Sequence, residues 1–161
     1  MFNAGLEKEV PVLIRPFAFE VPPGPAGTPA DDAEAVVALW SRCGLTRPWN
    51  DPWRDIERKR SQHPELFLVG EVDGAVIASA MVGYDGHRGW VNYLAVAPEH
   101  QRQGRARALM TEAEARLTVL GCPKLNLQVR GSNAAALGFY AALGYALDDV
   151  VSLGKRLIPD Q

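Results

Sequence analysis

Hydrophobic and polar residues follow two different periods along the chain, and these periods predict where strands and helices lie. Between residues 66 and 97, β-branched and aromatic residues form three runs. The dipeptides Asp73-Gly74 and Asp85-Gly86 separate these runs, and both are typical of β-hairpin turns. The pattern therefore predicts three antiparallel strands, at about residues 66–72, 75–84 and 89–97.

A helical period follows these strands. Its apolar positions share one face of a helix that ends at Gly121, and they are Ala106, Leu109, Met110, Ala113, Leu117 and Leu120. Three shorter helices are predicted, from about Thr28 to Gly44, from Asp51 to His63, and from Ser132 or Asn133 to Gly144. Further strands are predicted at residues 10–17, 124–130 and 150–158.

The order of these elements is β-α-α-β-β-β-α-β-α-β, which predicts a mixed α/β sheet in a single domain, residues 1–161. A strand–helix–strand connection spans residues 91–130, so its two strands should be parallel and joined by a right-handed crossover. The remaining strand pairs should be antiparallel. We therefore expect a mostly antiparallel central sheet flanked by helices, with one parallel strand pair.

Composition narrows the class of protein. The chain has 161 residues and a formal net charge of −2, which argues against a nucleic-acid-binding protein. No apolar run approaches the ~20 residues of a membrane span, and no secretory signal is recognisable, so we expect a cytoplasmic protein. The three histidines are scattered, so we expect no metal site. Cys43 and Cys122 should be free thiols rather than a disulfide.

Residues 99–110, EHQRQGRARALM, begin the longest predicted helix with unfavourable charges. A helix N-terminus carries partial positive charge and free N–H groups, so acidic residues are favoured there. This one has Arg102, Arg105 and Arg107 around Gly104 instead. A bound phosphate would make the arginines counter-charges, and Gly104 would let it approach the backbone closely. The alternative is a solvated cationic turn. Neither the Walker loop nor the three-glycine dinucleotide fingerprint fits.

Residues 101–106, QRQGRA, resemble the Q/R-x-x-G-x-G/A motif of the GNAT N-acetyltransferase superfamily. The preceding YLAVAP and the later NAAALGFYAALGY are similar to two further parts of the family pattern, in the expected order. The resemblance extends from about Ile14 to Leu157. The segment LQVRGSNAAALGFY is similar to the ribosomal-protein acetyltransferase subgroup RimI. The segments RPWNDPWRDIERK, YDGHRG and SLGKRLI most resemble bacterial YpeA-type members.

The resemblance implies that acetyl-CoA is the acetyl donor and binds in a V-shaped cleft where the two parallel strands diverge. Backbone N–H groups should hold its pyrophosphate, at Arg102, Gln103, Gly104, Arg105, Ala106 and Arg107. Its pantetheine arm should pair with the main chain of Leu94, Ala95 and Val96. Asn133 should contact the pantetheine or diphosphate arm, and Tyr140 should lie near the sulfur.

Tyr140 is the candidate catalytic acid. When an amine attacks a thioester, an oxyanion develops and coenzyme A leaves as a thiolate, and a tyrosine hydroxyl can donate a proton to the departing sulfur. The alternative is a core aromatic residue, because Tyr140 follows Leu137 by three residues on the predicted helix.

Gln128 departs from the family resemblance, since RimI-like enzymes carry a glutamate at this point of the strand. Glutamine cannot remove a proton from an ammonium substrate. A base from elsewhere, a chain of waters, or an acceptor that arrives neutral would have to replace it. The candidate bases are Glu71, Asp85, His87 and Glu99, and we assign the role to none of them.

Residues 46–53, TRPWNDPW, occupy the region that lines the acceptor side in related enzymes. Trp49 and Trp53 would stack on a substrate, and Asp51 or Asp55 would meet an amine. The alternative is that Asp51 caps a helix and the tryptophans fill a core.

These features predict an N-acetyltransferase that moves an acetyl group from acetyl-CoA to a primary amine by direct attack in a ternary complex. The amine would belong to a small molecule, a protein N-terminus or a lysine. The alternative is a non-catalytic module that binds or senses acyl-CoA. The sequence is compatible with a homodimer.

Overall fold

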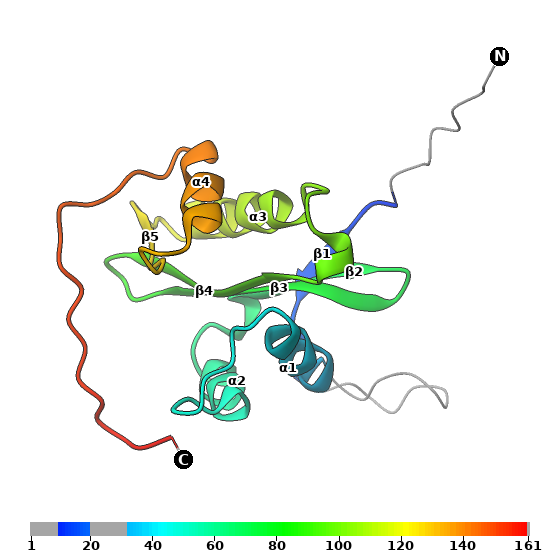
Figure 1. The fold of residues 1–161 in the computed structure, drawn as a ribbon, viewed down its shortest axis with the longest axis horizontal. Coiled ribbons are helices and arrows are strands. Elements are labelled where there is room, and N and C mark those ends of the chain that lie inside the picture. Colours follow the sequence, from blue (N-terminus) through cyan, green and yellow to red (C-terminus); the bar gives the residue numbers. More distant parts are fainter. Residues whose placement is uncertain (1–9, 20–31, 161) are drawn as a thin grey trace.

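The computed structural model describes residues 10–19 and 32–160, and Figure 1 shows how their elements are arranged. The strands are β1 (Leu13–Pro16), β2 (Phe67–Val72), β3 (Ala75–Tyr84), β4 (Gly89–Val96) and β5 (Leu125–Leu127). The helices are α1 (Ala33–Arg42), α2 (Pro52–Arg60), α3 (Arg105–Val119) and α4 (Ala134–Ala142), with short 3₁₀ turns η1 (Pro64–Leu66) and η2 (Pro98–His100).

The five strands form one sheet in the order β1-β2-β3-β4-β5. The first four strands are antiparallel neighbours, whereas β4 and β5 are parallel. This confirms the mixed, mostly antiparallel sheet with one parallel pair. The parallel pairing covers only Gly89–Val91 and Leu125–Leu127, although β4 continues to Val96. Past Val91 the two strands diverge, which gives the pair the shape of a V.

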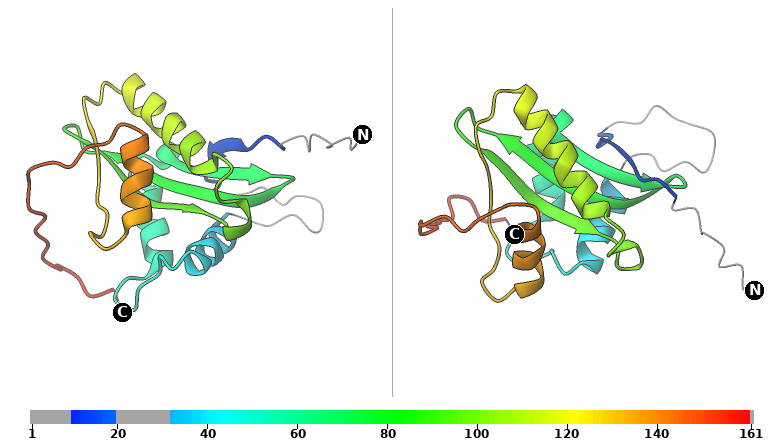
Figure 2. Two further views of the ribbon diagram at one scale, coloured as in Figure 1. Left: turned by 45° about the horizontal axis from the view of Figure 1, so that its top comes forward. Right: turned by 90° about the horizontal axis from the view of Figure 1, so that it is seen from above.

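Helices cover both faces of the sheet. In Figures 1 and 2, α1 and α2 lie on one face, and α3 and α4 lie on the other. Contacts agree with this arrangement, because α3 packs on β2, β3 and β4 while α1 packs on β3, β4 and α2. The sheet is therefore buried between two helical layers, as its apolar strands predict.

The core on the α1 face is built around Trp40, which is fully buried. Its indole Nε1 donates a hydrogen bond of 2.9 Å to Ser79 Oγ, so the polar edge of the ring is satisfied. Its ring stacks on Tyr93 with a centroid distance of 3.9 Å and lies 6.1 Å from Phe67. This aromatic stack fixes α1 against the centre of the sheet.

The hairpins follow the turn chemistry of the sequence. Asp73 and Gly74 both have positive φ, 50° and 80°, as a two-residue type I′ turn requires. In the second hairpin Gly86 has φ 86°, and the Asp85 carboxylate accepts the N–H groups of His87 and Arg88. Both predicted turns are confirmed.

Gly89, at the start of β4, is required by packing rather than by backbone conformation. A Cβ there would lie 2.8 Å from Leu117 Cδ1 and 3.1 Å from Cys122 Sγ. Leu117 is buried on α3 and has little room to move. We expect Gly89→Ala to lower the free energy of unfolding by about 1–3 kcal/mol, the usual cost of overpacking. Urea unfolding measures this, with Gly83→Ala, where a Cβ meets nothing within 4 Å, as the matched control.

The predicted last strand, residues 150–158, is wrong, because none of these residues, all of which the structure describes, belongs to a strand. A strand needs a backbone partner as well as suitable residues, and β5 is only three residues long. The segment is held by side chains instead, through the Lys124–Asp148 ion pair, a 2.5 Å hydrogen bond from Gln128 Nε2 to Ser152 Oγ, and ion pairing of Asp160 with Arg58. It leaves α4 and ends against α2 (Figure 1).

Other predicted boundaries shift at element ends. The first strand begins at Leu13 rather than residue 10, and the fifth covers Leu125–Leu127 rather than 124–130. The helix predicted from Thr28 is described only from Ala33, with Asp32 before it, and Thr28 lies outside the described residues. Gly44, Gly121 and Gly144 follow their helices with positive φ, as predicted.

Candidate functional site

The loop before α3 presents a run of unpaired backbone N–H groups. The first bonded amide of the helix is Ala108, which donates to Gly104 O at 3.0 Å. Within the described part of the chain, none of the six N–H groups of residues 102–107 has a hydrogen-bond partner. Gly104 precedes the helix with φ 74°, and Arg102 also has positive φ, 62°. The geometry is that of an anion-binding helix N-terminus.

Side chains hold this loop in place. Gln101 Nε2 donates to Val96 O at 2.9 Å, and Gln103 Nε2 donates to Glu99 O at 3.3 Å. The loop is thus tied to the end of β4, so the free N–H groups have a fixed position relative to that strand.

The side chain of Arg105 does not act as the expected counter-charge, and this corrects the sequence interpretation. Arg105 is buried, and its Nη2 donates to Val10 O at 2.7 Å. The first helical turn thus directs this side chain toward the segment before β1 rather than outward. Arg102 and Arg107 are exposed at the loop, so two of the three guanidiniums remain available to an anion.

The free edge of β4 begins where β5 departs. Ala97 N–H donates to Ile77 O, and hydrogen-bonded pairs alternate along an antiparallel ladder, so Ala95 directs its main-chain groups to Ser79 on β3. Leu94 and Val96 direct theirs to the free edge. Val96 O already accepts from Gln101 Nε2. Leu94 and Val96 are therefore the residues whose main-chain groups can pair with a ligand at this edge. Ala95 lies between them, and its main-chain groups point to β3 instead.

A β-bulge at Tyr93 changes which side chains face the acceptor side. Two residues of β4, Tyr93 and Leu94, oppose the single Ala80 of β3, and Tyr93 has φ 52°. Gly89 faces α3, so an unbroken alternation would point residue 93 the same way. The bulge turns the Tyr93 side chain to the opposite face of the sheet, where its ring stacks on Trp40 of α1. Asn92 and Tyr93 consequently face the same side.

Two predicted residues lie on or before α4. Asn133 caps this helix, since its Oδ1 accepts from Ala136 N at 3.1 Å, and its Nδ2 has no hydrogen-bond acceptor among the described residues. Tyr140 is half-buried, and its ring contacts Phe139 and Tyr145 with centroid distances of 5.0 and 5.6 Å. Among the described residues its hydroxyl has no hydrogen-bond partner. Burial raises the pKa of Tyr140 to about 12, so the hydroxyl keeps its proton.

We call the place where β4 and β5 diverge, after Val91 and Leu127, the fork. A cavity of about 530 Å³ opens there. Asn92 and Gln128 line it, and each directly follows the last paired residues, Val91 and Leu127. The other lining residues come from β3, the bulge, the segment before α4, and the α1–α2 region: Leu45, Arg47, Trp49, Asn50, Asp55, Met81, Tyr93 and Arg130.

A polar network forms one wall of this cavity. Asp55 Oδ2 accepts from Tyr93 Oη at 2.7 Å and from Asn50 Nδ2 at 2.5 Å, while Oδ1 accepts from Arg58 Nη1 at 3.0 Å. Burial, together with the Asp55 carboxylate, raises the pKa of Tyr93 well above its ordinary value. Tyr93 is therefore a neutral donor, and Asp55 is a carboxylate held by three partners.

Of the four residues predicted to lie on the acceptor side, only some line the cavity. Trp49 and Asp55 line the cavity, whereas Trp53 and Asp51 do not. Asp51 caps α2 by accepting from the N–H groups of Trp53 and Arg54, as the alternative interpretation has it. Trp53 is 49% exposed on α2, so it fills no core.

None of the four candidate bases lines the cavity. Glu71 forms an ion pair with Arg15 beside β1, and Glu99 forms one with Arg42 beside η2. Asp85 and His87 lie in the β3–β4 turn, where the backbone N–H groups of residues 87 and 88 hold the pKa of the Asp85 carboxyl below its usual range. Gln128 does line the cavity, but an amide is no base.

Sequence reasoning missed Arg47, Asn50, Asn92, Tyr93 and Arg130 as cavity residues. Arg47 and Asn50 stand within the segment already singled out, and Arg130 follows the predicted fifth strand. The position of Tyr93 depends on the bulge, which hydrophobic alternation does not show.

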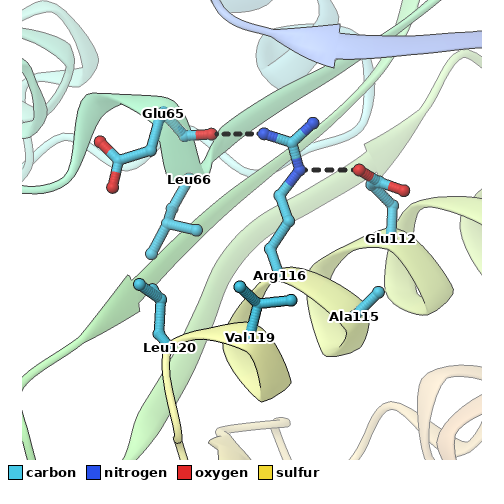
Figure 3. A pocket seen from close by; sticks show the side chains of 7 residues that line it. All are labelled: Glu65, Leu66, Glu112, Ala115, Arg116, Val119 and Leu120. Carbon is cyan, nitrogen blue, oxygen red and sulfur yellow. Dashed lines mark hydrogen bonds and ion pairs between the residues drawn. The ribbon is translucent and has the colours of Figure 1, made fainter.

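A second pocket, of about 370 Å³, lies on the outer face of α3 against η1 (Figure 3). Arg116 crosses it, donating from Nε to Glu112 Oε1 at 2.7 Å and from Nη1 to Glu65 O at 3.0 Å. None of the sequence-predicted site residues lines it, so we place no chemistry there.

Over residues 10–19 and 32–160, no group of three or more His, Cys, Asp or Glu side chains is arranged to hold a metal ion. Cys43 and Cys122 are both free and half-buried, and burial raises the pKa of the Cys43 thiol. None of the helices in the described residues is long and apolar enough to cross a bilayer.

Comparison with known proteins identifies the class to which this fold and loop belong. A sequence model of the acetyltransferase (GNAT) family matches residues 33–145, from α1 to just past α4. The chain belongs to the GNAT acetyltransferase family, and it is an acetyltransferase enzyme.

Individual relatives agree with this family. The chain is 53% identical over 131 residues to an acetyltransferase of Yersinia pestis and to one of Pectobacterium atrosepticum, covering 81% of this chain and 93% of each relative. Among solved structures it resembles the ribosomal-protein-S18-alanine N-acetyltransferase of Escherichia coli, with 26% identity, a TM-score of 0.65, and coverage of 83% of this chain and 76% of that one. It shares the fold of Ard1 from Thermoplasma volcanium, with 21% identity, a TM-score of 0.67, and coverage of 85% and 84%.

Proposed function

We propose that this acetyltransferase takes its acetyl group from acetyl-CoA and transfers it to a primary amine by direct attack in a ternary complex. The observation that carries the proposal is the run of six unpaired N–H groups at residues 102–107, tied to the strand edge that leads to the fork between β4 and β5.

Acetyl-CoA fits this arrangement from end to end. Its pyrophosphate would accept from the free amides of residues 102–107, beside the exposed Arg102 and Arg107. Asn133 Nδ2, which has no acceptor among the described residues, is a donor for the diphosphate or pantetheine arm. The pantetheine amides would pair with Leu94 and Val96 along the free edge of β4, as an added strand does. The thioester then reaches the cavity at the fork.

The transfer step follows from these positions. The amine nitrogen forms a bond to the thioester carbon, its C–S bond breaks, and the electron pair leaves on sulfur as a thiolate. A strand-edge N–H facing the carbonyl oxygen would stabilise the oxyanion by roughly 2.7–4 kcal/mol. Tyr140, which is protonated and has a hydroxyl without a partner among the described residues, would donate its proton to sulfur, and the proton that the nitrogen loses on forming the amide would pass through water and restore the hydroxyl.

The proton of the ammonium form needs another route. Gln128 cannot accept it, and Asp55 is already held by Tyr93, Asn50 and Arg58. We propose that the acceptor loses its proton to water before attack, and we assign no protein base.

The second candidate function is a module that binds acyl-CoA without turnover. Gln128 favours it, because its side chain donates to Ser152 Oγ rather than offering a carboxylate to the cavity. The unpartnered Tyr140 hydroxyl favours catalysis.

One experiment in two stages tests these functions. Acetyl-CoA should raise the melting temperature of the protein, and coenzyme A thiol should then be released in the presence of small amines, amino acids, and peptides with free N-termini or lysines. Binding without thiol release across that panel would support the binding module. The absence of acetyl-CoA binding would overturn both.

A further inference from the structure

We propose that the acceptor is a primary amine of the amino-acid class, whose carboxylate is bound in the fork cavity by Arg47 and Arg130. This inference rests on the proposed transfer to an amine, and it deepens that proposal by naming the chemical class of the acceptor.

The charge balance of the cavity is the first observation. Three charged side chains line it, namely Arg47, Asp55 and Arg130. Asp55 is bound within the protein, since it forms an ion pair at 3.0 Å with Arg58, which also pairs with Asp160, and it accepts from Tyr93 and Asn50. Neither Arg47 nor Arg130 has a carboxylate partner among the residues that the structure describes. The two arginines of the cavity are therefore free of ion pairs with the described residues, whereas its one carboxylate is bound to protein groups.

Arg47 is held in place without being neutralised. Its Nη1 donates to two backbone carbonyls of its own loop, Gly44 O at 2.6 Å and Thr46 O at 2.8 Å. Carbonyl groups fix the orientation of the guanidinium but leave its charge, and Nε and Nη2 remain as donors. A guanidinium fixed in this way loses little rotamer entropy when it binds a carboxylate.

Arg130 lines the cavity from a different segment, between β5 and α4. Its carbonyl accepts from Asn133 N at 2.8 Å, which fixes the backbone between β5 and the cap of α4. Its side chain is exposed and has no hydrogen-bond partner in the described residues. Arg47 and Arg130 thus border the cavity from two elements.

The remaining walls fit the rest of an amino acid. Leu45 and Met81 are apolar, and the indole of Trp49 is 52% exposed at the cavity. These side chains would take an apolar or aromatic substituent. A polyamine would place several positive charges against two arginines, and Coulomb repulsion makes that occupant unfavourable. A carboxylate instead gains charge-assisted and bidentate hydrogen bonds.

The test compares matched acceptors with matched variants. Phenylalanine, phenylalaninamide, 2-phenylethylamine and spermidine would be compared by thiol release at saturating acetyl-CoA. We expect kcat/KM to be highest for phenylalanine. In Arg47→Gln and Arg130→Gln the KM for phenylalanine should rise about tenfold or more, while the KM values for 2-phenylethylamine and acetyl-CoA stay unchanged. Comparing variants across one acceptor pair cancels the difference in amine basicity.

Arg88→Gln is the control, because Arg88 lies in the β3–β4 turn and donates to His87 O, away from the cavity. Equal KM changes for phenylalanine and 2-phenylethylamine, or faster acetylation of the amine than of the amino acid, would overturn the proposal. If no acceptor is acetylated, the proposal is tested by calorimetric titration of phenylalanine into the coenzyme A-loaded protein. Binding that both cavity variants weaken supports the proposal, and no binding overturns it. Failure of the proposed function is distinct, since it would appear as no acetyl-CoA binding or as no thiol release with any acceptor of the panel, whereas failure of this inference appears in the order of acceptors or in the binding of phenylalanine.

Discussion

Replacing Gly104 with glutamate is expected to abolish acetyl-CoA binding, with a loss in affinity of about a hundredfold or more. Two effects act together. Gly104 has φ 74°, a conformation that costs a residue with a Cβ about 1–2 kcal/mol, so the loop would shift. The new carboxylate would also lie among the free N–H groups proposed to hold the pyrophosphate. Isothermal titration with acetyl-CoA measures the change directly.

The matched control is Gly86→Glu. Gly86 also has positive φ, 86°, and a Cβ there meets nothing within 4 Å, just as at Gly104. It lies in the β3–β4 turn, at the opposite end of β4 from the loop. This variant should carry a similar backbone strain and the same added charge while binding acetyl-CoA normally. Normal binding by Gly104→Glu would show that the anion site lies elsewhere.

Tyr140→Phe is expected to lower kcat by at least about tenfold, while the fold and the affinity for acetyl-CoA remain as in the unmodified protein. Phenylalanine preserves the ring contacts with Phe139 and Tyr145 and removes only the hydroxyl. That hydroxyl makes no hydrogen bond with a described residue, so its removal should cost little stability. Initial rates of thiol release, with an acceptor from the amine panel, give kcat and KM separately.

Tyr145→Phe is the control for Tyr140. The Tyr145 hydroxyl donates to Glu114 Oε1 at 2.6 Å, and its ring lies 5.6 Å from that of Tyr140. The control therefore loses a hydroxyl in the same cluster and should lower stability slightly while leaving kcat unchanged. Equal turnover by Tyr140→Phe and the unmodified protein would assign Tyr140 to the core instead.

Turn dipeptides and hydrophobic periods within short segments were sufficient to predict most of the fold. Asp73-Gly74 and Asp85-Gly86 define two hairpins because their turn conformations depend on those residues themselves. The helix from Arg105 follows from its apolar period. The segment 150–158 shows the limit of such signals, since its apolar residues suit a strand but β5 offers only three residues beside it. Whether a strand forms depends on its partner, which lies elsewhere in the sequence.

The candidate site was predictable where one short segment determines the geometry. Gly104 and its neighbours form the expected loop of free amides, while Asn133 caps the expected helix and Tyr140 lies on it. Arg105 was misjudged because the three arginines around Gly104 look alike in sequence, whereas the first helical turn buries Arg105, whose side chain donates to Val10 O. Tyr93 was missed because a bulge depends on how two strands match in length.

The fork between β4 and β5 joins the two faces of the sheet. The loop of residues 102–107 leads into α3, whereas Trp49 and Asp55 reach the fork from the α1–α2 region. In the proposed arrangement the two substrates arrive through separate entrances, and neither has to depart before the other binds. No protein side chain then needs to carry the acetyl group between half-reactions, and the free thiols of Cys43 and Cys122 require no role in turnover.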